Sequence, residues 1–86
     1  MTMKTNYETL FKLAFERRDT PSCLDIIDMG LREDGDDFRE WLAKDALLAV
    51  TGYGLLRQQD GHEPLDEFVL PVAQRLAEVI QHFPRN

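Results

Sequence analysis

The chain has 86 residues, of which 43% are hydrophobic and 30% charged, a balance typical of globular and not of disordered proteins. This length predicts one domain, residues 1–86, with no room for a second core. With 16 acidic and 10 basic residues, the net charge of −6 disfavours phosphate backbones and anionic membranes and favours basic partners.

Cysteine content and hydropathy favour the cytoplasm as the location of the protein. The single cysteine, Cys23, cannot form an intrachain disulfide, so the fold does not depend on an oxidising compartment. The first residues are polar and do not resemble a signal peptide. The longest apolar run, residues 46–50, is far too short to span a bilayer. We therefore expect a cytoplasmic protein without membrane contact.

Helical periodicity covers the first part of the chain in two segments. The first is predicted over about residues 6–18, with Thr5 or Asn6 as its cap. The second begins at Thr20, a suitable cap, with Pro21 in the first helical position, where a missing N–H group costs nothing. Their apolar faces comprise Tyr7, Leu10, Phe11, Ala14 and Phe15 in the first segment and Cys23, Leu24, Ile26, Ile27 and Leu31 in the second.

The third helical segment is predicted from about residue 37 to residue 50 or beyond, capped by Asp36 or Asp37. Gly52 and Gly54 then weaken the helix, and residues 55–57 can extend it after a kink. Residues 58–64 are expected to form a loop. The predicted face of this segment is apolar except for one carboxylate and comprises Phe38, Trp41, Leu42, Asp45 and Leu48.

The last segment, about residues 65–83, has the clearest periodicity, and Pro84 is expected to end it. Pro71 lies inside it and cannot donate to the carbonyl of Glu67. The unbroken periodicity favours a helix that is kinked or broken near Pro71; alternatively, the main helix begins at Pro71 after a short turn. The segments together predict an all-α, four-helix bundle-like domain with short loops, whose wide apolar stripes can support a homodimer.

Motifs for metal binding and for catalysis are missing from the sequence. There is no HExxH motif and no paired CxxC, and the acids of residues 33–37 do not fit the register of an EF-hand loop. Cys23 lies beside apolar residues, and no spacing brings His62 or His82 close to it. We therefore predict no cofactor, no metal and no enzymatic activity.

The strongest functional feature is an acidic run just before and around the start of the third helix. Such a concentration of carboxylates steers and binds basic surfaces, and Trp41 directly after it can serve as an anchor. We therefore expect a non-enzymatic protein-binding module: an inhibitor, an immunity or antitoxin-like protein, an anti-defence protein or a regulatory adaptor. The predicted partner-binding residues are Glu33, Asp34, Asp36, Asp37 and Glu40.

Two alternatives remain open. The first is a small-ligand-binding helical regulator, expected to be dimeric, with Tyr53, Arg57 and His62 as polar pocket residues near the glycine break. The second is a DNA-associated regulator that uses Arg17 and Arg18. Direct nucleic-acid binding is the weaker alternative, because the candidate recognition helices carry carboxylates instead of clustered basic residues.

Overall fold

The structure, a computed structural model, describes residues 5–82, and every regular element in that range is helical. The elements are α1 (Tyr7–Glu16), α2 (Thr20–Asp34), α3 (Asp36–Trp41), the π-helical turn η1 (Leu42–Ala46), α4 (Leu47–Gln59) and α5 (Val69–Gln81). Because α3, η1 and α4 follow one another without interruption, they form one long rod, and the described chain has four helical rods. The all-α prediction is confirmed, whereas Phe83 and Pro84 lie outside the described residues.

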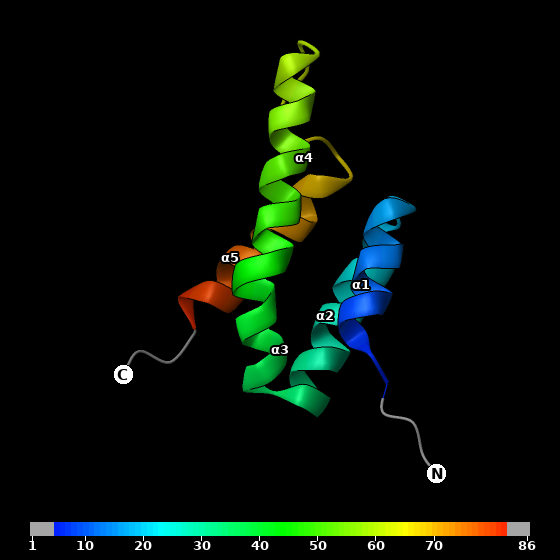
Figure 1. The fold of residues 1–86 in the computed structure, drawn as a ribbon, viewed down its shortest axis with the longest axis vertical. Helices are drawn as coiled ribbons and strands as arrows, with labels where there is room; N and C mark the ends of the chain where they lie inside the picture. The colour runs from blue at the N-terminus through cyan, green and yellow to red at the C-terminus, as the bar shows by residue number, and fades with distance from the viewer. Residues whose placement is uncertain (1–4, 83–86) are drawn as a thin grey trace.

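The helices form a flat arrangement with extents of 47 × 33 × 17 Å. Figure 1 shows α1 and α2 as an antiparallel pair beside the long rod, with α5 behind the rod on its other side. The C-terminal turns of α4 project past the other helices at the top of the view. Arg75 of α5 ties the two sides together, since its guanidinium lies 2.5 Å from Asp28 of α2.

The helix starts and the bend between α2 and α3 are fixed by residues suited to them. Asn6 accepts a hydrogen bond of 3.1 Å from the N–H group of Thr9 and caps α1, as predicted. The cap of α2 is Asp19 rather than the predicted Thr20, because the Asp19 carboxylate accepts from the N–H group of Ser22 at 3.3 Å. Gly35, with φ of +61°, joins α2 directly to α3 in a conformation that glycine adopts without strain.

The π-helical turn explains which face of the long rod is buried. The buried residues of the long rod recur every fourth position. In a regular α-helix, residues four positions apart are turned about 40° further around the axis at each step. The wider turn at residues 42–46 offsets part of this drift, so one side of the rod keeps facing the core. Leu48, predicted on the apolar face, is instead exposed. The buried series comprises Phe38, Leu42, Ala46, Val50 and Gly54.

The last segment is broken near Pro71, one of the two forms of the favoured prediction, and the break is a short turn before α5 and not a kink. α5 begins at Val69, so Pro71 lies in its first turn, where backbone N–H groups have no acceptor within the helix. Residues 65–68 keep helical spacing in the sequence but precede the helix. Phe68 still packs its ring against Phe15 and Tyr53, which explains the spacing.

The core is a single cluster that draws on every helix. Phe11, Ile27, Leu42, Val72 and Leu76 are its almost completely buried centre. An aromatic layer from α1, α3 and α4 surrounds this centre, so the core is closed without the outer face of α4. The buried residues are Tyr7, Phe11, Ala14, Cys23, Ile26, Ile27, Phe38, Leu42, Ala46, Val50, Val69, Val72, Leu76 and Val79.

Candidate functional site

The predicted acidic residues gather at the bend between α2 and α3. Glu33 and Asp34 end α2, Gly35 makes the bend, and Asp36, Asp37 and Glu40 lie on α3 directly after it. Glu8 on the first turn of α1 lines the same shallow hollow as Asp34, so it adds a sixth carboxylate that the sequence analysis missed. We call Glu8, Glu33, Asp34, Asp36, Asp37 and Glu40 the acidic corner.

Part of the acidic corner is bound by the protein's own side chains. The Tyr7 hydroxyl donates to the Glu33 carboxylate, which fixes the end of α2 against α1 and raises the pKa of Tyr7. Arg39 pairs with Asp36 at 2.7 Å across one helical turn.

Lys44 pairs with Glu40 at 2.8 Å, and this contact lowers the pKa of Glu40 and raises that of Lys44. Asp36 and Glu40 of the acidic corner are therefore paired with Arg39 and Lys44. Asp36 and Glu40 remain well exposed, with 78% and 56% of their side-chain surfaces in solvent. Exposed pairs of this kind are worth little and exchange readily for an external cation.

Trp41, predicted as an anchor, is half-buried and combines a core contact with an open edge. Its ring stacks on Phe38 at 5.7 Å and meets Phe11 edge-on at 5.7 Å. The same ring lines a hollow of about 140 Å³ between α1 and the long rod, and this hollow is mostly apolar. Lys12 lies over the ring at 5.9 Å. An apolar side chain of a partner fits this environment.

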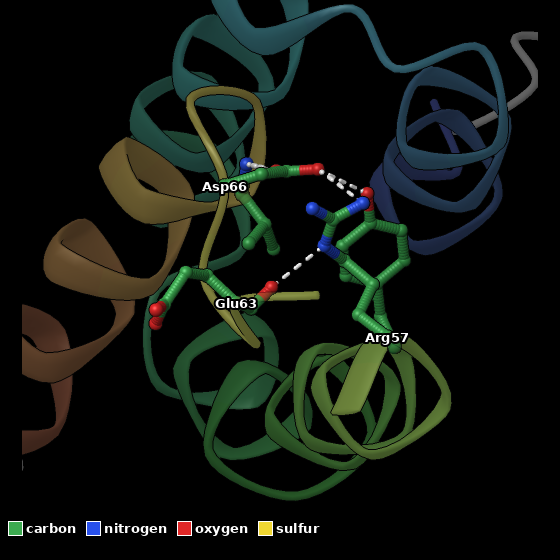
Figure 2. A network of polar contacts seen from close by, with 5 residues as sticks. Arg57, Glu63 and Asp66 are labelled. Carbon is green, nitrogen blue, oxygen red and sulfur yellow. Dashed lines mark hydrogen bonds and ion pairs between the residues drawn. The ribbon is translucent and has the colours of Figure 1, made fainter. Parts of the chain in front are cut away.

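Tyr53 and Arg57, predicted as pocket residues, meet at Asp66 in the loop before α5. The Tyr53 hydroxyl donates to Asp66 Oδ2 at 2.5 Å, and Arg57 Nη1 lies 3.3 Å from the same oxygen. Arg57 Nε also donates to the carbonyl oxygen of Glu63 at 2.8 Å. Figure 2 shows the Arg57 guanidinium reaching from α4 between the two loop residues.

The other oxygen of Asp66 starts α5. Asp66 Oδ1 accepts from the N–H group of Val69, the first residue of α5, at 2.9 Å, so one carboxylate holds both the start of α5 and the end of α4. Burial of the Asp66 carboxyl raises its pKa, but the hydrogen bonds from Tyr53 and Val69 and the charge of Arg57 outweigh this effect, and the pKa is lowered overall. Burial and the bond to Asp66 raise the pKa of Tyr53.

The contacts of Tyr53 and Arg57 hold the loop before α5 to α4. The polar atoms of Tyr53 and Arg57 that face inward are already bonded to the loop, and His62 lies exposed in that loop, outside the network. The three predicted ligand residues are therefore brought together only in part. Asp66 was missed, although an aspartate three positions before a helix residue is a recognisable capping pattern.

The remaining candidates for chemistry are placed apart from one another. Cys23 is completely buried, and burial raises the pKa of its thiol to about 11, so the reactive thiolate is suppressed. Within residues 5–82, no group of three or more His, Cys, Asp or Glu side chains is arranged to hold a metal ion. In the same range, each helix is too short or too polar to cross a bilayer.

Comparison of the chain with protein-family models, with curated proteins and with solved structures finds no match.

Proposed function

We propose that the protein is a non-enzymatic binding module that places its acidic corner against a basic surface of another protein. The observation that carries this proposal is the convergence of six carboxylates from three helices on one corner of the fold. Among the described residues, Arg39 and Lys44 pair with Asp36 and Glu40 of this corner. The resulting negative potential accelerates association with a basic surface and fixes its orientation.

The contacts inside the corner support this proposal further. The Tyr7–Glu33 bond and the glycine bend hold the two helix ends in place, so little conformational entropy is lost on binding. Because Arg39 and Lys44 pair with Asp36 and Glu40 only at the surface, arginines of a partner can replace them. The hollow beside Trp41 offers an adjoining apolar contact.

The ligand-binding alternative has less support than the acidic corner. It requires free polar atoms on Tyr53 and Arg57, and these atoms are bonded to Asp66 and Glu63 instead. A role for Arg17 and Arg18 on DNA would require phosphate binding by a chain whose net charge is −6.

The proposal is tested by reversing charge at the corner. A triple variant, Asp36→Lys with Asp37→Lys and Glu40→Lys, is used to isolate binding proteins from the native host beside the wild-type chain. The three side chains are exposed, so we expect a folded protein by circular dichroism. We expect the triple variant to lose the partner that the wild-type chain binds. The association rate of that partner with the wild-type chain should fall at least tenfold between low and physiological salt.

The matched control makes the same change of charge elsewhere. Asp25→Lys with Glu63→Lys and Glu67→Lys alters three exposed carboxylates outside the corner. We expect this control to retain the partner, with association slowed far less than in the corner variant. A partner that binds the corner variant as well as the control would contradict the proposal, because only the net charge would then matter.

A further inference from the structure

The hollow beside Trp41 combines an apolar lining with a charged edge. Its two walls are α1 and the long rod, which contact each other there through the rings of Phe11 and Trp41. The lining also includes Phe15, and on the rod it includes the short side chains of Ala46 and Ala49. The hollow measures about 140 Å³, several times the volume that one water molecule needs. It therefore has room for one long side chain of a partner.

Three charged side chains line the same hollow. Glu16 of α1 and Asp45 of η1 are exposed, and neither makes a hydrogen bond or an ion pair within residues 5–82. The third is Lys12, whose ammonium lies over the Trp41 ring at 5.9 Å. Two carboxylates and one cation leave this edge negatively charged.

The other basic residues nearby in the sequence are directed elsewhere. Lys44, next to Asp45, is in an ion pair within the acidic corner. Arg17 and Arg18 follow α1 directly, but neither lines the hollow, and Arg18 lies over the Tyr53 ring at 5.8 Å. The hollow is therefore complementary to a side chain that is apolar along its length and positively charged at its end.

We propose that the hollow receives an arginine side chain of the basic partner. Its methylene stem lies against the apolar lining, and its guanidinium lies over Trp41 and pairs with Glu16 and Asp45, in place of the Lys12 ammonium. This inference rests on the proposed function, because it names the residue that the basic surface inserts beside the acidic corner. The two sites adjoin, since Trp41 directly follows Glu40 in the chain.

The lining and the edge together favour arginine over other side chains. A purely apolar side chain would fill the lining but would leave Glu16 and Asp45 without a cation. The ammonium of lysine is compact and strongly hydrated, whereas a planar guanidinium stacks on an indole ring and has donors for two carboxylates at once. Lys12 already holds a cation over this ring, and because Lys12 is exposed it can turn into solvent when the arginine enters.

The first experiment uses Trp41, the single tryptophan of the chain, as its reporter. A capped tripeptide with arginine between two alanines is titrated into the isotope-labelled full chain at low ionic strength, and NMR follows the indole N–H resonance. We expect a saturable shift in the millimolar range, about threefold weaker binding of the lysine peptide and at least about tenfold weaker binding of the uncharged citrulline peptide. No saturable shift, or equal binding of the citrulline or leucine peptide, would overturn the proposal.

The second experiment closes the hollow. Ala49→Leu fills it from the long rod, and Ala77→Leu makes the same change at an exposed position of α5 as the control. Both alanines are exposed, so we expect both variants to fold, as judged by circular dichroism. Ala49→Leu should abolish the shift caused by the arginine peptide, and Ala77→Leu should preserve it. Undiminished peptide binding by Ala49→Leu would contradict the assignment of the site.

Lys12→Gln tests the exchange of the two cations. This variant removes the ammonium that competes for the Trp41 ring, so the arginine peptide should bind about threefold more tightly. Unchanged or weaker peptide binding would show that the arginine does not take the place of Lys12, contrary to the proposal.

The native partner separates this inference from the acidic corner. Ala49→Leu should speed dissociation of that partner at least about tenfold and leave its association nearly unchanged, because no steering charge is altered. The triple lysine variant of the acidic corner should still bind the arginine peptide within about threefold of the wild type, since Glu16 and Asp45 are intact. Full retention of the partner by Ala49→Leu would refute the arginine site and leave the acidic corner standing. Retention by the triple variant with loss by Ala49→Leu would refute the acidic corner alone.

Discussion

At Gly30 of α2, the ring of Phe38 from α3 lies directly against the helix backbone. A Cβ at this position would lie 2.3 Å from Cε2 of Phe38, well inside contact distance. The Phe38 ring cannot easily move, because Tyr7 packs against it at 6.0 Å and Trp41 stacks on it at 5.7 Å. The absence of a side chain at Gly30 therefore permits the aromatic layer that supports both the core and the acidic corner.

Replacement of Gly30 by alanine tests this contact. Alanine favours the helix by about 1 kcal/mol, but overpacking against a fixed ring costs more, so we expect a net loss of about 2 kcal/mol in the free energy of unfolding. Urea unfolding of dilute protein, followed by circular dichroism, measures this loss.

The matched control for Gly30→Ala is Gly52→Ala, also in the middle of a helix but with open space around the added methyl group. At Gly52 only the higher helix propensity of alanine acts, so we expect the free energy of unfolding to rise by about 0.5–1 kcal/mol. Both proteins are compared at a concentration where each is monomeric. Equal stability of Gly30→Ala and Gly52→Ala would contradict the close contact between α2 and the Phe38 ring.

At the scale of elements, Asp66 joins α4 to α5. Its lowered pKa means that the folded state prefers the ionised carboxyl, so the stabilisation is complete above the ordinary aspartate pKa of 3.8. This stabilisation is lost as the pH falls through the lower native pKa. We expect Asp66→Asn to cost about 1–2 kcal/mol at pH 7 and progressively less below pH 4. Urea unfolding at a series of pH values measures this convergence.

Glu67→Gln serves as the control for Asp66→Asn. Glu67 is the next residue, is exposed and has no hydrogen bond or ion pair within the described part of the chain. Its substitution should change stability by less than about 0.5 kcal/mol at any pH. A stability difference between wild type and Asp66→Asn that persisted unchanged at low pH would contradict the assigned role of the Asp66 charge.

The number and type of the helices could be predicted from the sequence because apolar spacing and capping residues are local signals. The orientation of α4 could not, because the π-helical turn at residues 42–46 depends on packing against other helices. Leu48 therefore faces solvent, contrary to the prediction. Helical spacing before Pro71 likewise reflected the packing of Phe68 in a turn.

The candidate site was predictable to a similar degree. The acidic run is contiguous in sequence, so its location at the α2–α3 bend could be predicted. The contribution of Glu8 and the Tyr7–Glu33 bond depend on the packing of α1 against α2, which sequence spacing does not reveal. Tyr53 and Arg57 were predicted as pocket residues near the glycine break, but their shared carboxylate, Asp66, lies in the loop before α5 and was not predicted.

At the scale of the whole molecule, net charge opposes folding while it favours binding. The chain carries 16 acids and 10 bases, and six of the acids share one corner. In the ion pairs that offset this repulsion, such as Arg39–Asp36 and Arg75–Glu78, the carboxylates are 78% and 60% exposed, so solvent screens the pairs and they contribute little. Repulsion between carboxylates therefore outweighs attraction between pairs when salt does not screen them.

Salt should consequently stabilise the fold, the opposite of its effect on the proposed complex. Raising NaCl from about 10 mM to about 150 mM shortens the screening length from about 30 Å to about 8 Å, so we expect Tm to rise by a few degrees. Calorimetry of dilute protein measures this rise, and choline chloride at equal ionic strength should reproduce it if screening is the cause. The rise should be smaller in Asp36→Asn with Asp37→Asn, since two charges of the acidic corner are then removed. A fall in Tm would mean that the exposed ion pairs dominate, and the corner would then not be the centre of repulsion that its binding role requires.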